Sequence, residues 1–195
     1  MARRDAERNR ARLAAAAEQV FRESGATAPL DLVAARAGLG RGTLYRHFPD
    51  REHLVAAVYA RRVEALEAHA APLPAEHRLE QLVVEIAQLQ LDVPGMVTAA
   101  RASEGLALLA DVERRTRSLL GAALDLAREQ GRVRADTTLE DVVLTFAMVE
   151  GVVATEQTER VAHSVRRAVE LALRGLLTQL AEPLPHPQLA LPTEP

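Results

Sequence analysis

The sequence predicts an all-α protein, and three observations carry that prediction. Ala, Leu, Glu and Arg, all strong helix formers, dominate the 195-residue chain between its glycine and proline breakers. Ile occurs once, Trp is absent and aromatic residues make up 3% of the chain, so typical strand formers are scarce. No stretch alternates apolar and polar residues convincingly. We expect about nine helices, divided between a three-helix N-terminal domain and a larger C-terminal helical domain.

Glycine and proline set the limits of the first three helices. Gly25 follows a one-sided apolar stripe and supplies the left-handed residue that commonly ends a helix. Pro29 opens the second helix because its fixed φ suits the first turn, and Gly38 breaks that helix. Pro49 ends the third, since the residue before a proline resists the α region. The expected spans are 5–24, 29–37 and 41–48.

Six further helices are expected after Pro49. Asp50 can cap the first of them, with Glu52 in its first turn at the positive end of the helix dipole. Five of the ten prolines fall after residue 182 and predict an extended tail. The expected helix spans are 50–71, 75–91, 94–103, 106–130, 138–154 and 159–180. The expected domains are residues 1–53, residues 54–182 and a Pro-rich tail over 183–195.

Charge is distributed unevenly between the two expected domains. Residues 1–53 carry 10 Arg and 7 acidic residues, whereas residues 54–195 carry 14 Arg and 20 acidic residues. This division indicates an N-terminal domain that meets a polyanion, although chance scatter would produce the same counts.

The residue inventory excludes several classes of protein. Without Lys or Cys, the chain has no P-loop lysine, no Schiff-base lysine and no thiolate nucleophile or metal ligand. Its six His include no pair four residues apart, so we expect no metal site, no cofactor and no enzyme activity. No apolar run approaches the roughly 18 residues of a membrane span, and the N-terminus lacks a signal peptide. We therefore expect a cytoplasmic protein with no membrane partner.

Residues 32–48 predict a helix-turn-helix motif. The small Ala34 lets two short helices cross closely, and Gly38 relieves the turn between them. Leu44 and Phe48, four residues apart, are expected to pack inward. The outward residues are donors with one aromatic among them and no carboxylate, as a major-groove reader requires. They are Arg41, Gly42, Thr43, Tyr45, Arg46 and His47.

The segment from Ala34 to Leu54 resembles the DNA-binding domain of the tetracycline-repressor (TetR) family, and the likeness covers about residues 10–58. Its core is Gly-Thr-Leu-Tyr-x-His-Phe at residues 42–48. The resemblance implies phosphate contacts from Thr43, Tyr45, His47 and Arg51. It leaves two operator-dependent positions as candidate base contacts, namely Arg41 and Arg46.

Several of these residues have plainer interpretations. Tyr45 can be a packing residue, and His47 can bond a nearby carbonyl. Pro29 stands where many family members have a capping Thr or Ser. Asp31 places a carboxylate near DNA, where it must cap the helix locally, accept a hydrogen bond from a cytosine amine or repel the phosphates. Five N-terminal arginines can form an arm on DNA or a solvated terminus: Arg3, Arg4, Arg8, Arg10 and Arg12.

The last two expected helices are apolar on more than one face, which favours burial in the subunit and against a second copy. The resemblance implies a two-fold four-helix bundle. The candidate dimer residues are Val142, Phe146, Val149, Val153, Val165, Ala168, Ala172 and Leu176, with Ala147, Gly151 and Ala154 allowing close approach. In similar proteins the preceding helices surround an effector pocket. The candidate lining residues, for an aliphatic effector, are Gln88, Leu91, Met96, Arg101, Glu104, Phe146 and Glu150.

These observations predict a ligand-responsive transcriptional regulator, most simply a repressor. It would bind a pseudo-palindromic double-stranded DNA operator as a homodimer and be released by a small-molecule effector. A regulator that has lost ligand control is the nearest alternative. An all-helical carrier or enzyme with a vestigial helix-turn-helix is the alternative from another class.

Overall fold

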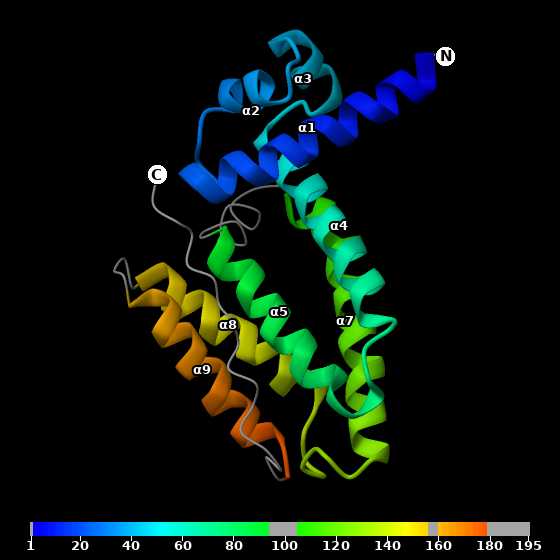
Figure 1. The fold of residues 1–195 in the computed structure, drawn as a ribbon, viewed down its shortest axis with the longest axis vertical. Helices are drawn as coiled ribbons and strands as arrows, with labels where there is room; N and C mark the ends of the chain where they lie inside the picture. The colour runs from blue at the N-terminus through cyan, green and yellow to red at the C-terminus, as the bar shows by residue number, and fades with distance from the viewer. Residues whose placement is uncertain (1, 94–104, 156–159, 179–195) are drawn as a thin grey trace.

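The computed structural model describes residues 2–93, 105–155 and 160–178 of the chain. A small helical head stands at one end of a longer helical body (Figure 1). Within the described ranges, all regular elements are helical, which confirms the all-α class. They are α1 (Ala2–Ser24), α2 (Leu30–Arg36), α3 (Arg41–His47), α4 (Arg51–Ala70), a 3-10 turn (Ala75–His77), α5 (Arg78–Asp92), α7 (Gly105–Glu129), α8 (Leu139–Thr155) and α9 (Val161–Leu176). The helix expected over 94–103 and the tail over 183–195 lie outside the described residues.

The helices begin and end close to the residues that the sequence indicated. Gly25 adopts a φ of +77° directly after α1. Pro29 precedes α2 as its N-cap residue, with a ψ of 131°, and is not its first helical residue. The helix expected over 75–91 is divided in the structure, because a 3-10 turn occupies its first three residues.

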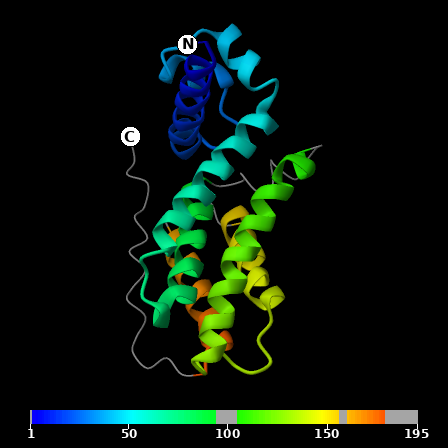
Figure 2. The same cartoon turned by 90° about the vertical axis from the view of Figure 1, so that its right-hand side faces the viewer.

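The head and the body have separate hydrophobic cores, and α4 contributes to both. Leu54, Val55 and Val58, from the first two turns of α4, pack into the head. Leu66 and Ala70, near its other end, pack into the body. In Figure 2, α4 passes from the head along the body. One continuous helix therefore connects the core of the head to the core of the body.

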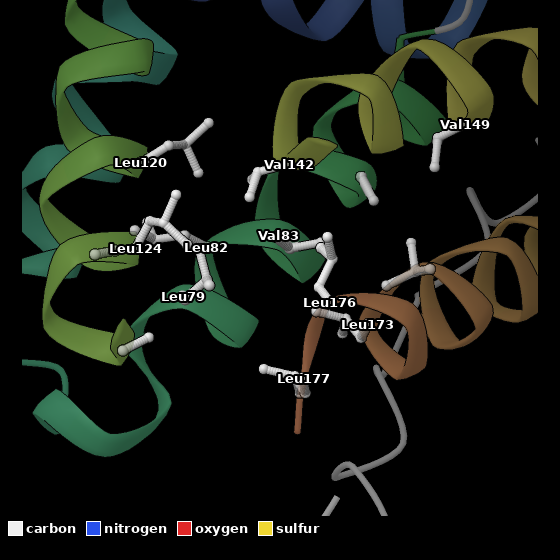
Figure 3. Close-up of a cluster of buried hydrophobic side chains, with 14 of the residues drawn as sticks. Leu79, Leu82, Val83, Leu120, Leu124, Val142, Val149, Leu173, Leu176 and Leu177 are labelled. Atoms are coloured by element: carbon white, nitrogen blue, oxygen red, sulfur yellow. The ribbon is translucent and has the colours of Figure 1, made fainter. Parts of the chain in front are cut away.

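The core of the body is aliphatic. Figure 3 shows side chains of α5, α7, α8 and α9 converging on one another. Helices α8 and α9 lie side by side along one edge of the body (Figure 1). The labelled core residues are Leu79, Leu82, Val83, Leu120, Leu124, Val142, Val149, Leu173, Leu176 and Leu177.

The last described helix ends earlier than expected, which corrects the predicted end at Leu180. Leu177 is extended, with a ψ of 147°, and pairs with Val133 in an isolated bridge. The Thr178 N–H donates to the Arg132 carbonyl at 2.9 Å, and the Arg134 N–H donates to the Leu176 carbonyl at 2.9 Å. The segment after α7 thus supplies backbone partners that continuing the helix would forgo.

Asp50 caps α4 as the sequence predicts. Its Oδ1 accepts from the His53 backbone N–H at 2.8 Å and lies 2.7 Å from the His53 Nδ1. Partial burial acts to raise the pKa of Asp50, but the hydrogen bonds from His53 hold that pKa below its ordinary value. The ionised carboxylate is thus the form that stabilises the start of α4.

Replacing Asp50 with alanine is expected to lower the free energy of unfolding by about 1 kcal/mol at pH 7. Because the folded pKa is depressed, this stabilisation is complete above the unfolded pKa and is lost as the pH falls through the folded pKa. Urea unfolding of both proteins, followed by circular dichroism at pH 7 and at progressively lower pH, should show the difference shrinking in acid. Asp50→Asn retains a capping oxygen and should keep most of the stability at pH 7. An Asp50→Ala deficit that stays constant with pH would contradict this account.

Candidate nucleic-acid interface

The turn between α2 and α3 is closed by backbone hydrogen bonds around a left-handed glycine. Gly38 has a φ of +63°, and its N–H donates to the Ala35 carbonyl at 3.0 Å. The Leu39 N–H donates to the Ala34 carbonyl at 3.0 Å. This pattern satisfies the last carbonyls of α2 and fixes the direction in which α3 leaves the turn.

Helix α3 has one buried face and one open face. Leu44 is 1% exposed and packs in the head core together with Phe48. On the other face, Tyr45 is 48% exposed. Arg46 is also exposed, and its guanidinium has no hydrogen-bond or ion-pair partner among the residues described. The open face therefore presents an aromatic and a free cation to solvent.

The remaining candidate residues of α3 lie on or beside this open face. Arg41 and Gly42 are exposed, and Thr43 and His47 are half-buried. Arg51 follows at the start of α4, where its Nη1 donates to the Ala26 carbonyl at 2.6 Å. That bond fixes the Arg51 side chain next to the loop between α1 and α2.

Two arginines of α1 bind backbone carbonyls of the helix-turn-helix motif. The Arg10 Nη1 donates to the His47 carbonyl at 3.0 Å, and its guanidinium lies 4.5 Å from the centroid of the Phe48 ring. The Arg12 Nη2 donates to the Ala37 carbonyl at 2.7 Å. Both cations thus meet the negative C-terminal ends of α2 and α3. Sequence reasoning missed this role because the partners lie 25 and 37 residues away.

Among the described side chains, Arg4 and Arg8 make no such contact with the motif. Arg8 pairs with Asp5 within α1, and Arg4 is exposed. The side chain of Arg3 lies outside the described part of the structure. Arg10 and Arg12 are thus held against the motif, and the arginines that remain candidates for an arm on DNA are Arg3, Arg4 and Arg8.

Asp31 and Arg41 form an ion pair across the motif. The Nε and Nη2 atoms of Arg41 donate to the two carboxylate oxygens of Asp31. Of the three roles that the sequence left open for Asp31, the observed one is a local interaction, with a side chain of α3.

A buried arginine joins the head to the body. Arg62 of α4 is 4% exposed; its Nε lies 3.4 Å from the Glu18 carboxylate of α1, and its Nη1 donates to the Leu89 carbonyl of α5 at 3.3 Å. Burial lowers the pKa of Arg62, and the negative charges of Glu18 and Asp92 oppose that shift. Its Nη2 has no hydrogen-bond partner among the described residues. One cation therefore links α1, α4 and α5.

The candidate effector residues lie on α5 and α8, in different environments. Gln88 donates to Asp92 at 2.6 Å, while Leu91 is 2% exposed and belongs to the body core. Gln90, which sequence reasoning missed, donates to the Phe146 carbonyl at 3.0 Å and to the Glu150 carboxylate at 3.2 Å. The side-chain carbonyls of Gln88 and Gln90 are buried without a partner in the described ranges. Three further candidates lie outside those ranges: Met96, Arg101 and Glu104.

Most of the candidate dimer residues are buried inside the subunit, so they have little surface to offer a second copy. Phe146, Ala168 and Ala172 are half-buried. The others are 8% exposed or less and belong to the body core: Val142, Val149, Val153, Val165 and Leu176. Both faces of α8 are apolar, so spacing alone does not distinguish its inward stripe. In α9 the exposed face carries His163, Arg167 and Arg174, which corrects the expectation of a second apolar face, and its apolar stripe is the inward one.

The outward face of α8 and α9 carries a different apolar set. Leu144 and Met148 on α8 are 55% and 47% exposed, and Leu171 on α9 is 53% exposed. Beside them, the small residues expected to allow close approach are exposed, namely Ala147, Gly151 and Ala154. We call Leu144, Met148 and Leu171 the outer apolar face. It is the surface of these helices available to a partner.

Among the described residues, no group of three or more His, Cys, Asp or Glu side chains could hold a metal ion. In the same part of the chain, no helix is both long and apolar enough to cross a membrane.

The N-terminal part of the chain is similar to known bacterial regulators. A sequence model described as "Bacterial regulatory proteins, tetR family" matches residues 13–58. An HTH-type transcriptional regulator of Staphylococcus aureus is 32% identical over 91 residues, which are 46% of this chain and 48% of the relative. The matched part is thus about half the length of that curated relative.

Solved structures extend the likeness over most of the chain. A TetR transcriptional regulator from Streptomyces coelicolor is 32% identical, with a TM-score of 0.60 over 86% of this chain and 98% of that one. A TetR transcription regulatory protein from Mycobacterium vanbaalenii is 29% identical, with a TM-score of 0.61 over 91% and 99% of the two chains. The likeness therefore includes the body as well as the head.

Proposed function

Because this chain belongs to the TetR family of transcriptional regulators, we propose that it is a cytoplasmic, effector-controlled repressor that binds a pseudo-palindromic operator as a homodimer. The observation that carries the proposal is the open face of α3. It holds Arg46, whose side chain has no partner in the described part of the chain, and a 48% exposed Tyr45, on a helix held in the head by Leu44 and Arg10. A short, rigid helix with outward donors fits the major groove.

We assign the contacts of the head by their reach and chemistry. Arg46 has its guanidinium free to meet base edges, as does the outer end of the Arg41 guanidinium. The hydroxyls of Thr43 and Tyr45, together with His47, suit phosphate oxygens on either side of the groove. Arg51 adds a cation at the start of α4. The set combines groups that read sequence with groups that position the helix.

The homodimer is supported by the outer apolar face, which a single subunit leaves in water. One recognition helix buries too little surface for specific binding at physiological salt, so two heads are needed. Operator half-sites are separated by roughly 34–36 Å, one turn of DNA, and a dimer must hold its heads at that distance. Burying the outer apolar faces of two subunits against each other would fix that separation.

Effector control is supported by the continuity of α4 and by the junction at Arg62. A ligand that moves α5 relative to α4 would act on the Leu89 carbonyl and on Arg62, and through Glu18 on α1. A ligand need only bind one head separation better than another to shift the population between them. The side-chain carbonyls of Gln88 and Gln90, which are unpaired among the described residues, are polar groups that such a ligand could engage.

Two arginine variants test the DNA contacts. Sequences selected from a random duplex library define the preferred site, and fluorescence anisotropy measures binding at several salt concentrations. Arg46→Ala is expected to reduce the free-energy difference between bases, at the base pair that Arg46 contacts, by about 1–3 kcal/mol. Arg51→Ala is expected to weaken binding to all sequences and to lower the salt slope by about one, because one phosphate contact is lost.

Arg51→Lys serves as the matched control, since it keeps the charge and should restore the salt slope. Equal losses on every sequence for Arg46→Ala and Arg51→Ala would contradict the division into base and phosphate contacts. Failure of the unaltered protein to select any duplex would favour a helical carrier or enzyme with a vestigial motif.

A further inference from the structure

The ion pair between Asp31 and Arg41 engages one particular edge of the guanidinium. Asp31 lies in the first turn of α2, and Arg41 is the first residue of α3. The carboxylate accepts from Nε and Nη2, so it meets the side of the guanidinium and leaves its outer end free. The Arg41 side chain remains 70% exposed. The pair thus orients the arginine without covering it.

The free end of the guanidinium has a defined hydrogen-bonding capacity. Arginine carries five N–H donors in a planar fork, and Asp31 uses two of them. Both N–H groups of Nη1 and one of Nη2 remain, on the side facing away from the carboxylate. Two parallel N–H groups at the end of an arginine match the O6 and N7 acceptors of guanine in the major groove.

We propose that Asp31 is a specificity-determining positioning residue that holds the Arg41 guanidinium so that its free end reads a guanine in each operator half-site. The inference rests on the proposed operator binding and adds both a residue and a base to it. A mobile arginine on this face could swing to the nearest phosphate, which carries no sequence information. A carboxylate beside it opposes that movement and repels the backbone of any DNA that lacks the compensating guanine.

A purely stabilising role explains the pair poorly. Ion pairs between exposed side chains contribute little to stability. The head contains another exposed pair of the same kind, in which Arg36 donates to both oxygens of Glu23 at 2.9 and 2.5 Å. That pair joins α2 to α1 and involves no residue of α3. It offers a control with the same chemistry away from the recognition helix.

The experiment compares Asp31→Asn with Glu23→Gln, each of which removes one carboxylate charge from the head. Duplexes carrying the selected site, its single-base variants and an unselected sequence are measured by fluorescence anisotropy at one salt concentration. For Asp31→Asn we expect discrimination at one guanine per half-site to fall by about tenfold, with several-fold tighter binding to unselected DNA. Glu23→Gln should leave the base preference unchanged. The melting temperatures of the two variants should be similar.

Arg41→Ala identifies the position that depends on Asp31. It should abolish the preference at the same guanine, and adding Asp31→Asn to Arg41→Ala should change that preference no further. The inference is overturned if Asp31→Asn leaves all base preferences intact, if its effect persists without Arg41, or if the Arg41-dependent base is not guanine. If the unaltered protein selects a site but no guanine preference depends on Asp31 and Arg41, this inference is overturned and the proposed operator binding stands. Loss of selectivity in the unaltered protein itself overturns the proposed operator binding as well.

Discussion

Replacing Phe48 with alanine is expected to unfold the head and to leave the body folded. Phe48 is fully buried in the head core, and Arg10 stacks on its ring. Truncating a buried phenylalanine costs about 3–5 kcal/mol, a large part of the stability of a core this small. The body has its own core, so its helices should survive. Duplex binding should be lost because α3 is no longer held.

Hydrogen exchange followed by mass spectrometry measures this result by segment. Peptides from α1, α2 and α3 should exchange rapidly in Phe48→Ala, whereas peptides from α7 and α9 should keep their protection. Tyr45→Ala is the matched control, because Tyr45 is an aromatic on the same helix with its side chain half exposed. It should leave protection unchanged within error while weakening DNA binding. Equal loss of protection in head and body would show that the two cores unfold as one unit.

The helices of the head could be predicted because their limits are set by local chemistry. Gly25 and Gly38 adopt the left-handed conformations expected of them, and Asp50 makes the expected cap. Each of these signals acts within a few residues of the chain. The family resemblance could be assigned from the same segment, since the spacing of Gly38 and of the residues after it defines the motif.

The contacts that hold and orient the motif could not be predicted in the same way. Arg10 and Arg12 act on carbonyls far along the chain, and nothing in their own neighbourhood distinguishes them from solvated arginines. The sequence showed Asp31 to be an anion on a cationic surface, but it did not indicate which residue Asp31 pairs with. Only the crossing of α2 and α3 brings it to Arg41.

The body shows a different limit. Helix α8 is apolar around much of its circumference, so periodicity identifies it as buried without indicating which face meets the rest of the subunit. In α9 the exposed His163, Arg167 and Arg174 mark the outward face. The end of α9 could not be placed because its cause is a backbone bridge to Val133, 44 residues earlier. Which residues of α8 remain exposed therefore depends on tertiary packing, and the outer apolar face is the surface that we propose for the dimer contact.

Replacing Leu144 with aspartate is expected to convert the proposed dimer into monomers and to weaken binding to the proposed operator by at least about a hundredfold. Leu144 is 55% exposed in the subunit and belongs to the outer apolar face. In a two-fold interface one substitution buries two like charges without partners, and each unpaired buried charge costs several kcal/mol. Every 1.4 kcal/mol changes an equilibrium constant tenfold, so dissociation follows at micromolar protein. A monomer presents one head and binds one half-site.

Sedimentation equilibrium gives the mass of each variant, and anisotropy on the selected duplex gives its affinity. Ala122→Asp places the same charge on an exposed position of α7 and should change neither quantity. Met148→Asp, one turn further along α8, should reproduce the effect of Leu144→Asp because both residues share the outer apolar face. Circular dichroism should show unchanged helix content in all three variants, since neither Leu144 nor Met148 belongs to the subunit core. A dimer that survives both substitutions with its operator affinity intact would place the subunit contact on another surface.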